Sequence, residues 1–388
     1  MLLSQKKTAL IVDVETAAVR AVLAEFAPET PVQIFARSTR MLRVTSEFDV
    51  SHLLKQIRSE TGEAIAEVLR RGSRRVDTAL CVITAPWHSA QIRIVHMSKD
   101  VPFKITGQMV ETALEEEQHA VETTTHAEIQ EGVRYAILET QRMRACVNGY
   151  LTSDIIGKQG TTLDLFFYIS LAQPFIVEFL KDLLAEHVHA SRIAVHSFPL
   201  VAFRALEKLV DTETGFLFLR IGGEVTELFA VRNGVFQEVA HFGIGERLAI
   251  RTLANDAAYS PEEAVSRLKR FAEGKLIGPE ADGAQKAIDK AAREWFSVFR
   301  KFLQNAAAER LLPQRVFISG NGALSRQAAA FIKREQAATF TILGRPFAVE
   351  EFSPHALAGL TVTQSEFLER GEEVLFFAAL FLQQTLRG

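Results

Sequence analysis

The chain has 388 residues, a hydrophobic content of 48% and a formal net charge of -3 at pH 7. A chain this long and this apolar can bury more than one core, so we expect at least two domains. Basic and acidic residues are interspersed, which argues against a nucleic-acid partner, because such a surface needs a clustered basic stripe.

The sequence also predicts a cytoplasmic setting. No segment approaches the ~20 apolar residues of a membrane-spanning helix, and the first apolar stretch stops at Asp13, which is too early for a signal peptide. Cys81 and Cys146 each lie in a short apolar run. This placement favours buried, reduced thiols over a disulfide.

In chain order, the first predicted element is a β-hairpin that breaks at residues 13–16. Residues 51–72 carry apolar side chains at helical spacing, and residues 74–86 indicate a buried strand that ends at Pro86. The pattern then changes to strand, helix, strand and strand over roughly 86–172. We interpret this segment as an insertion, after which a helix, a strand and another helix follow up to residue 210.

The second half begins with three strands joined by two tight reversals, one at Gly222-Gly223 and one at an Asn-Gly turn. A mostly helical block follows over 252–312, and then a strand, a glycine-rich bend and a helix. Each half thus opens with antiparallel strands around a turn and returns to a strand that leads into a helix. This repetition indicates two related halves.

Three turns in this order resemble the actin-like ATPase superfamily, in its FtsA and PilM branch. The family's first phosphate hairpin, strand-Asp-x-Gly-Thr-strand, is similar to "LIVDVETAAVRAVL", with Glu15 in the glycine's place. Its second, strand-Asp-x-Gly-Gly-x-Thr-Asp-strand, is similar to "LFLRIGGEVTELFAV", with Arg220 in place of the acid. Its adenosine motif, strand-Gly-Gly-Gly-Ala-helix, is similar to "VFISGNGAL", with Asn321 between two glycines.

The resemblance implies an α/β fold of duplicated, actin-like (ribonuclease H-like) domains around a nucleotide cleft, with an inserted strand-helix-strand-strand subdomain of the SHS2 type. The implied division is subdomain IA at 1–85 and 173–210 with the C-terminal helix 369–387 packed back on it, the insertion at 86–172, subdomain IIA at 211–251 and 313–368, and helical subdomain IIB at 252–312.

The resemblance also implies ATP and magnesium as ligands of the cleft, with Asp13 as the residue that would orient the metal; an empty cleft is the alternative. Two β-turns of this kind hold phosphates with backbone N–H groups. Glu263 and Lys269 are at places similar to the family's ribose contacts, although a solvated helix face explains them equally well. The implied site residues are Asp13, Glu15, Thr16, Arg220, Gly222, Gly223, Thr226, Glu263, Lys269, Gly320, Asn321, Gly322 and Ala323.

Arg220 puts a base where the family has an acid, and three interpretations follow. At an effective dielectric of about 20, two unit charges 4 Å apart interact by roughly 4 kcal/mol, so the change is not neutral for a metal site. The guanidinium pairs with Asp13 or Glu15 across the cleft, which we favour, or it replaces the metal as counter-ion to a nucleotide, or it points to solvent. Under each interpretation we predict weak or absent ATP hydrolysis.

The sequence stops soon after its apolar final helix, which resembles PilM more than FtsA. The resemblance implies a scaffold of type IV pilus or related inner-membrane assembly machinery. It would reach the membrane by binding the N-terminal cytoplasmic peptide of a PilN-like membrane protein at the inserted subdomain. The alternatives are an FtsA-like division protein that polymerises and binds a tubulin-like partner, and an active sugar or metabolite kinase of the same fold. Self-association is left open.

Overall fold

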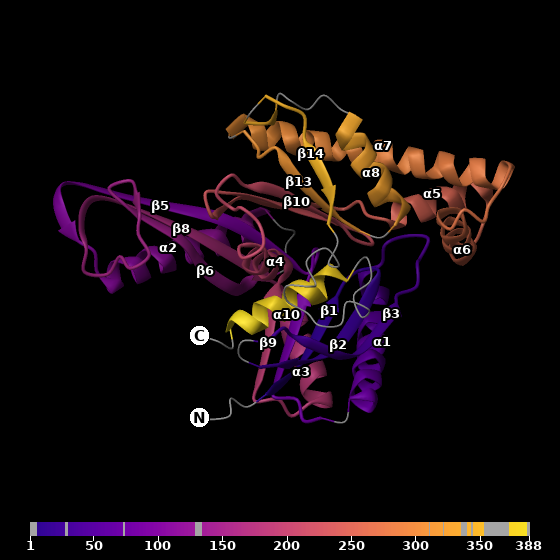
Figure 1. The fold of residues 1–388 in the computed structure, drawn as a ribbon, viewed down its shortest axis with the longest axis horizontal. Helices are drawn as coiled ribbons and strands as arrows, with labels where there is room; N and C mark the ends of the chain where they lie inside the picture. The colour runs from indigo at the N-terminus through magenta and orange to yellow at the C-terminus, as the bar shows by residue number, and fades with distance from the viewer. Residues whose placement is uncertain are drawn as a thin grey trace.

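The computed structural model describes residues 6–27, 30–72, 74–128, 134–309, 311–320, 322–334, 340–342, 344–352 and 372–385. Over these ranges the strands form two sheets of five strands and one sheet of four. Figure 1 shows the two larger sheets one above the other, with the smaller sheet projecting to one side.

The first sheet comes from the N-terminal half and has the strand order β3-β2-β1-β4-β9. Its strands are β1 (Lys7–Val14), β2 (Ala18–Phe26), β3 (Gln33–Met41), β4 (Thr78–Ile83) and β9 (Arg192–Ser197). The predicted hairpin is confirmed, because β1 and β2 pair antiparallel, while β4 and β9 run parallel to β1 and to each other. Two helices, α1 (Val50–Arg71) and α3 (Pro174–His187), share an apolar core with one face of this sheet.

The second sheet repeats this arrangement with the order β12-β11-β10-β13-β14. Its strands are β10 (Phe216–Ile221), β11 (Thr226–Arg232), β12 (Val235–Phe242), β13 (Arg315–Ser319) and β14 (Ala348–Glu351). The helices that share a core with its outer face are α5 (Arg247–Ala257), α6 (Pro261–Ala272), α7 (Pro279–Glu309) and α8 (Ala323–Arg334). The same strand order in both halves confirms the predicted duplication.

The third sheet is antiparallel and arises from the segment between β4 and α3. Its order is β5-β8-β6-β7, from β5 (His88–Lys104), β6 (Ala136–Val147), β7 (Tyr150–Leu151) and β8 (Gln159–Ala172). The helix α2 (Gly107–Glu128) packs on it, because alternate residues of β8 such as Leu163, Leu165 and Phe167 point to that face. The strand-helix-strand-strand pattern is therefore present, with the two-residue β7 added.

The C-terminal helix α10 (Glu373–Thr385) lies between the two larger sheets, as Figure 1 shows in yellow. It contacts α4 (Phe198–Leu206), and its Phe377 ring lies 5.7 Å from Phe218 of β10 and 5.0 Å from Phe352. We expected the C-terminal helix, over 369–387, to pack back on the first half, and within its described residues α10 contacts α4, β1 and β2. Residues 373–382 are apolar nearly all round, so α10 also buries against rings of the second half.

Two further observations concern the setting. Among the helices of the described ranges, none is long and apolar enough to cross a membrane. Cys81 is buried in β4 and Cys146 is half-buried in β6, and both are free thiols.

Candidate functional site

A pocket of about 780 Å³ opens between the two halves, where the predicted turns meet. Asn321 lies outside the described residues. The predicted residues that line the pocket are Glu15, Gly222, Gly223, Lys269, Gly322 and Ala323. The predicted residues that lie outside its lining are Asp13, Thr16, Arg220, Thr226, Glu263 and Gly320.

Glu15 joins the first turn directly to the second. Its Oε1 accepts a hydrogen bond from the Gly223 backbone N–H at 2.9 Å. Its Oε2 lies 3.1 Å from a guanidinium nitrogen of Arg220 and accepts a bond from Arg20 at 2.9 Å. The Glu15 carboxylate therefore accepts the hydrogen bond of a backbone N–H group that, by the resemblance, would bind a phosphate.

The glycine pair is required by the close approach of the two turns. A Cβ atom at Gly223 would lie 2.7 Å from the Cβ of Ala17, and one at Gly222 would lie 2.8 Å from Oε1 of Glu15. The Thr16 hydroxyl accepts a hydrogen bond from the Glu224 backbone N–H at 2.9 Å. The two hairpins thus contact each other directly.

Asp13 lies behind this contact and is completely buried. Its Oδ2 accepts a hydrogen bond from Arg20 at 2.8 Å, while Oδ1 has no partner among the described residues. Burial raises the pKa of Asp13 to about 6, against the lowering effect of Arg20 and Arg220. Burial also opposes ionisation of Glu15, but the same two guanidiniums outweigh it and hold the pKa of Glu15 at about 2.

Arg220 points into the protein, so the interpretation that places it in solvent is wrong. Its side chain is 6% exposed, and its guanidinium lies 5.3 Å from the ring centre of Phe198. Burial alone would lower the pKa of Arg220, but Glu15 and Asp13 raise it above its usual value. The ion pair with Glu15 agrees with the interpretation that we favoured from the sequence.

A second link between the halves starts at Glu224, whose side chain turns towards α5. Its carboxylate accepts hydrogen bonds from Arg247 at 3.2 Å and from Arg251 at 2.8 Å. These arginines also donate to backbone carbonyls of the first half, Arg247 to Leu42 at 2.8 Å and Arg251 to Thr45 at 3.2 Å. The negative charge of Glu224 is therefore neutralised by α5 and does not enter the pocket.

The N-terminus of α8, which belongs to the predicted adenosine motif, also binds a carboxylate of the chain. Glu246 accepts hydrogen bonds from the backbone N–H groups of Leu324 at 3.0 Å and Ser325 at 2.9 Å. A Cβ atom at Gly322 would lie 1.9 Å from Glu246 Oε2, so a larger residue there would displace the Glu246 carboxylate. Burial raises the pKa of Glu246, although these hydrogen bonds favour its charged form.

Two of the predicted site residues, Thr226 and Glu263, form hydrogen bonds that stabilise the fold. The Thr226 hydroxyl donates to the Ile244 carbonyl at 2.7 Å and accepts from the Trp295 indole N–H at 2.8 Å. Glu263 closes a capping box with Ser260 at the start of α6.

Arg20 and Glu246 complete the site and were not among the residues predicted from the sequence. A signal for Arg20 was present, because a hairpin that breaks after Asp13 places Arg20 opposite Asp13 in the register. Glu246 follows a second glycine-rich bend, but nothing in the local sequence indicates that it binds α8, 78 residues further along the chain.

The duplicated sheets and the pocket between them define the class of protein: the chain has the actin-like ATPase fold. It matches no protein-family model and no curated protein sequence. Among solved structures, it is similar to a PilM–PilN type IV pilus biogenesis complex, with a TM-score of 0.61 and 15% identity over 97% of this chain and 98% of that chain.

Two other similar structures are nucleotide complexes. ParM of Bacillus thuringiensis with ADP has a TM-score of 0.43 at 8% identity, over 98% of this chain and 99% of that chain. A non-polymerising MamK mutant bound to AMPPNP has a TM-score of 0.42 at 12% identity, over 97% and 99%.

Proposed function

We propose that the chain is an actin-like scaffold with a PilM-like role, whose cleft is held together by its own charged side chains. The observation that carries the proposal is the position of the Glu15 carboxylate, between the Gly223 N–H and the guanidinium of Arg220. Asp13 and Glu15 face Arg20 and Arg220, so the cluster balances its charge without a metal or a phosphate.

A phosphate at the Gly223 N–H would have to displace Glu15 from its partners. Removing one partner of a buried ion pair costs about 3–5 kcal/mol, because the other charge stays buried. The residues also do not fit magnesium. Asp13 has a single unpartnered oxygen and lies 2.8 Å from the Arg20 guanidinium, whose positive charge repels a divalent cation.

The likeness to the PilM–PilN complex over nearly the whole of both chains supports a PilM-like role. On this proposal the partner is the N-terminal cytoplasmic peptide of a PilN-like membrane protein, bound at the third sheet. The protein would then be cytoplasmic and attached peripherally to the inner membrane. We further propose that the three sheets with their helices correspond to the subdomains that the sequence implied.

Both alternative functions are weaker on the site geometry. A kinase of this fold needs an acid free to accept a proton from a hydroxyl. Asp13 and Glu15 are both engaged by Arg20. An FtsA-like division protein has no specific support in the described residues.

Calorimetric titration of the purified chain with magnesium-ATP tests the state of the cleft. We expect no binding at micromolar nucleotide for the native chain, and tighter binding for the double variant Glu15→Gly, Arg220→Asp, which restores the family's residues. Arg315→Asp, at an exposed ion pair with Glu350, is the matched control and should behave as the native chain. Micromolar binding with turnover by the native chain would overturn the proposal.

A further inference from the structure

We propose that the pocket between the two halves binds a small amphiphilic anion, an aliphatic carboxylate. Its chain fills the pocket, and its acid group lies at the mouth, which is formed by Met41, Arg43, Val265 and Lys269. The inference goes beyond the proposed function, with which it shares only the direct contact between the two turns.

The deep end of the pocket is formed by the glycine pair of the second turn and by the start of α8, and its polar groups are paired with each other. The Gly222 N–H donates to a carbonyl of its own turn at 3.0 Å, and the Gly223 N–H donates to Glu15 at 2.9 Å. The carbonyl oxygens of these glycines accept hydrogen bonds from the N–H groups of Glu246 at 2.8 Å and Arg247 at 2.9 Å. A ligand that needs a donor here would have to break one of these bonds, so this end favours an apolar group.

The deep end also repels a negative charge. Glu15 and Glu246 both line the pocket, and Glu246 already accepts the N–H groups of Leu324 and Ser325 at the start of α8. An anionic group of a ligand would compete with these carboxylates for the same donors. If the ligand carries a negative charge, that charge therefore lies away from the deep end.

The walls between the deep end and the mouth are largely apolar. The segment after β3 contributes Leu42 and Val44, α5 contributes Ile250, and α6 contributes Val265 and Leu268. The volume of about 780 Å³ lies within the range of about 300–1,000 Å³ that is usual for small-molecule sites. Such walls favour an aliphatic body, which is bound by burial of apolar surface.

At the mouth, each half contributes one exposed apolar residue and one cation. Met41 of the first half is 67% exposed and Val265 of the second half is 39% exposed. Arg43 lies two residues after Met41, and Lys269 lies about one helical turn after Val265. Neither the Arg43 guanidinium nor the Lys269 ammonium forms an ion pair or a hydrogen bond with the described residues. A carboxylate at the mouth would pair with both.

Two acidic residues of α6 and its end lie near this mouth. Glu262 also lines the pocket, about two helical turns before Lys269. Glu273 attracts Lys269 at longer range, but its carboxylate pairs with Lys275 at 2.7 Å. The mouth therefore has two cations against the single acid Glu262, which favours one negative charge on the ligand.

Calorimetric titration of the folded full chain with straight-chain carboxylates, from hexanoate to decanoate, tests the inference. We expect decanoate to bind, and Kd to fall about fourfold for each added CH2 group that the pocket buries. Decylammonium has the same chain with the opposite charge and should bind at least fivefold more weakly. Adenosine should not displace decanoate. A Kd that is independent of chain length, or displacement by adenosine, would overturn the inference.

Substitutions to Gln separate the apolar walls from the charges at the mouth. Met41→Gln and Val265→Gln should weaken decanoate and its uncharged analogue decanol alike, at least threefold each. Arg43→Gln and Lys269→Gln should weaken decanoate about two- to fivefold and leave decanol unchanged, because only the carboxylate pairs with them. Glu262→Gln removes a repulsive charge and should tighten decanoate. Equal effects of the Arg43 and Lys269 variants on both ligands would contradict the position of the acid group.

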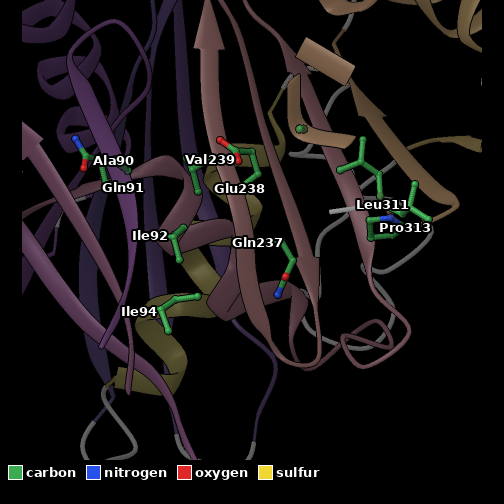
Figure 2. Close-up of a pocket in the computed structure, with 11 residues that line it drawn as sticks. Ala90, Gln91, Ile92, Ile94, Gln237, Glu238, Val239, Leu311 and Pro313 are labelled. Carbon is green, nitrogen blue, oxygen red and sulfur yellow. The ribbon is translucent and has the colours of Figure 1, made fainter. Parts of the chain in front are cut away.

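A second groove of the molecule provides the control for non-specific binding of an aliphatic chain. It lies between β5 and β12 and has a volume of about 430 Å³. Figure 2 shows Ile92 and Ile94 on one side of this groove and Val239 on the other. Ile94→Gln, at a residue that is 41% exposed, should leave the Kd of decanoate unchanged. If Ile94→Gln weakens decanoate and Val265→Gln does not, the pocket between the halves is not the site.

The outcome can be separated from that of the proposed function. If neither decanoate nor magnesium-ATP binds, the inference fails and the proposed function stands. If magnesium-ATP binds at micromolar concentration with turnover, the proposed function fails. The inference then still stands if decanoate binds and if Met41→Gln and Val265→Gln, in chains of native thermal stability, weaken that binding.

Discussion

Glu15 of the first half and Arg220 of the second form an ion pair at 3.1 Å, with each side chain 6% exposed. Each residue differs from the one that the family's phosphate motif has at that position, and the charges of the two residues neutralise each other. Because the pair joins two different sheets, it is a contact between the halves of the molecule. The two sides of the cleft are therefore joined by an ion pair that residues of this chain form by themselves.

Arg220→Met should destabilise the protein strongly, because it leaves Glu15 buried beside one guanidinium in place of two. We expect a loss of about 3–5 kcal/mol in the free energy of unfolding, measured by denaturant titration at pH 7. Arg315→Met breaks an exposed pair and should cost about 1 kcal/mol or less. Similar losses in the two variants would contradict the structural importance of Arg220.

Asp13→Asn should change how stability depends on pH. The folded state raises the pKa of Asp13 from 3.8 to about 6, so the folded chain binds this proton more tightly than the unfolded chain. Stability from this group is complete below pH 4 and falls as the pH rises towards 6, by about 3 kcal/mol for a shift of about two units. Asn cannot ionise, so this fall should be absent from the variant.

Glu15 contributes with the opposite sign, which separates the two groups. Its folded-state pKa of about 2 lies below the ordinary value of 4.5, so its stabilisation is present above pH 4.5 and is lost as the pH falls towards 2. Denaturant titrations from pH 3 to 7 distinguish the two effects. An identical pH profile for the native chain and Asp13→Asn would show that Asp13 ionises normally.

Gly223→Ala should force the two hairpins apart. The added methyl group would lie 2.7 Å from Ala17 Cβ and 2.8 Å from its backbone nitrogen, so we expect a loss of about 1–3 kcal/mol on thermal unfolding. Gly283→Ala is the matched control, because open space surrounds that position in α7. It should stabilise the chain by about 0.4–1 kcal/mol. A neutral Gly223→Ala would mean that the turns are not in contact.

Glu246→Ala should loosen the start of α8, since two backbone N–H groups lose their acceptor. Loss of such a cap costs about 0.5–2 kcal/mol. Hydrogen exchange should quicken at Leu324 and Ser325, which donate to Glu246. Lys269 lines the same pocket, but its side chain does not cap a helix, so Lys269→Ala is the matched control. This variant should leave hydrogen exchange at these amides unchanged.

The sequence was sufficient for the hairpins and for the turns, because those features depend on local patterns. The hairpin around residues 13–16 follows from apolar strands on both sides of a polar break, and the repeated half follows from the same pattern. The site was only partly predictable. Glu15 accepts a hydrogen bond from Gly223, which lies 208 residues further along the chain. No local propensity encodes that contact.

The position of α10 shows the same limit. Its apolar composition predicts burial but not which surfaces cover it, since a helix that is apolar all round has no preferred face. It contacts α4, β1 and β2 of the first half, and its Phe377 ring also contacts Phe218 and Phe352 of the opposite half. The Arg220 side chain was correctly predicted to pair across the cleft, because a buried guanidinium requires a nearby carboxylate.

Hydrogen exchange at the Gly223 amide, resolved by NMR, tests the central claim most directly. If the Glu15 carboxylate holds this donor, the amide is protected without nucleotide, and millimolar magnesium-ATP does not change its exchange rate. An amide that exchanges freely in the native chain and becomes protected when magnesium-ATP is added would contradict the account, because the donor would then be reserved for a phosphate.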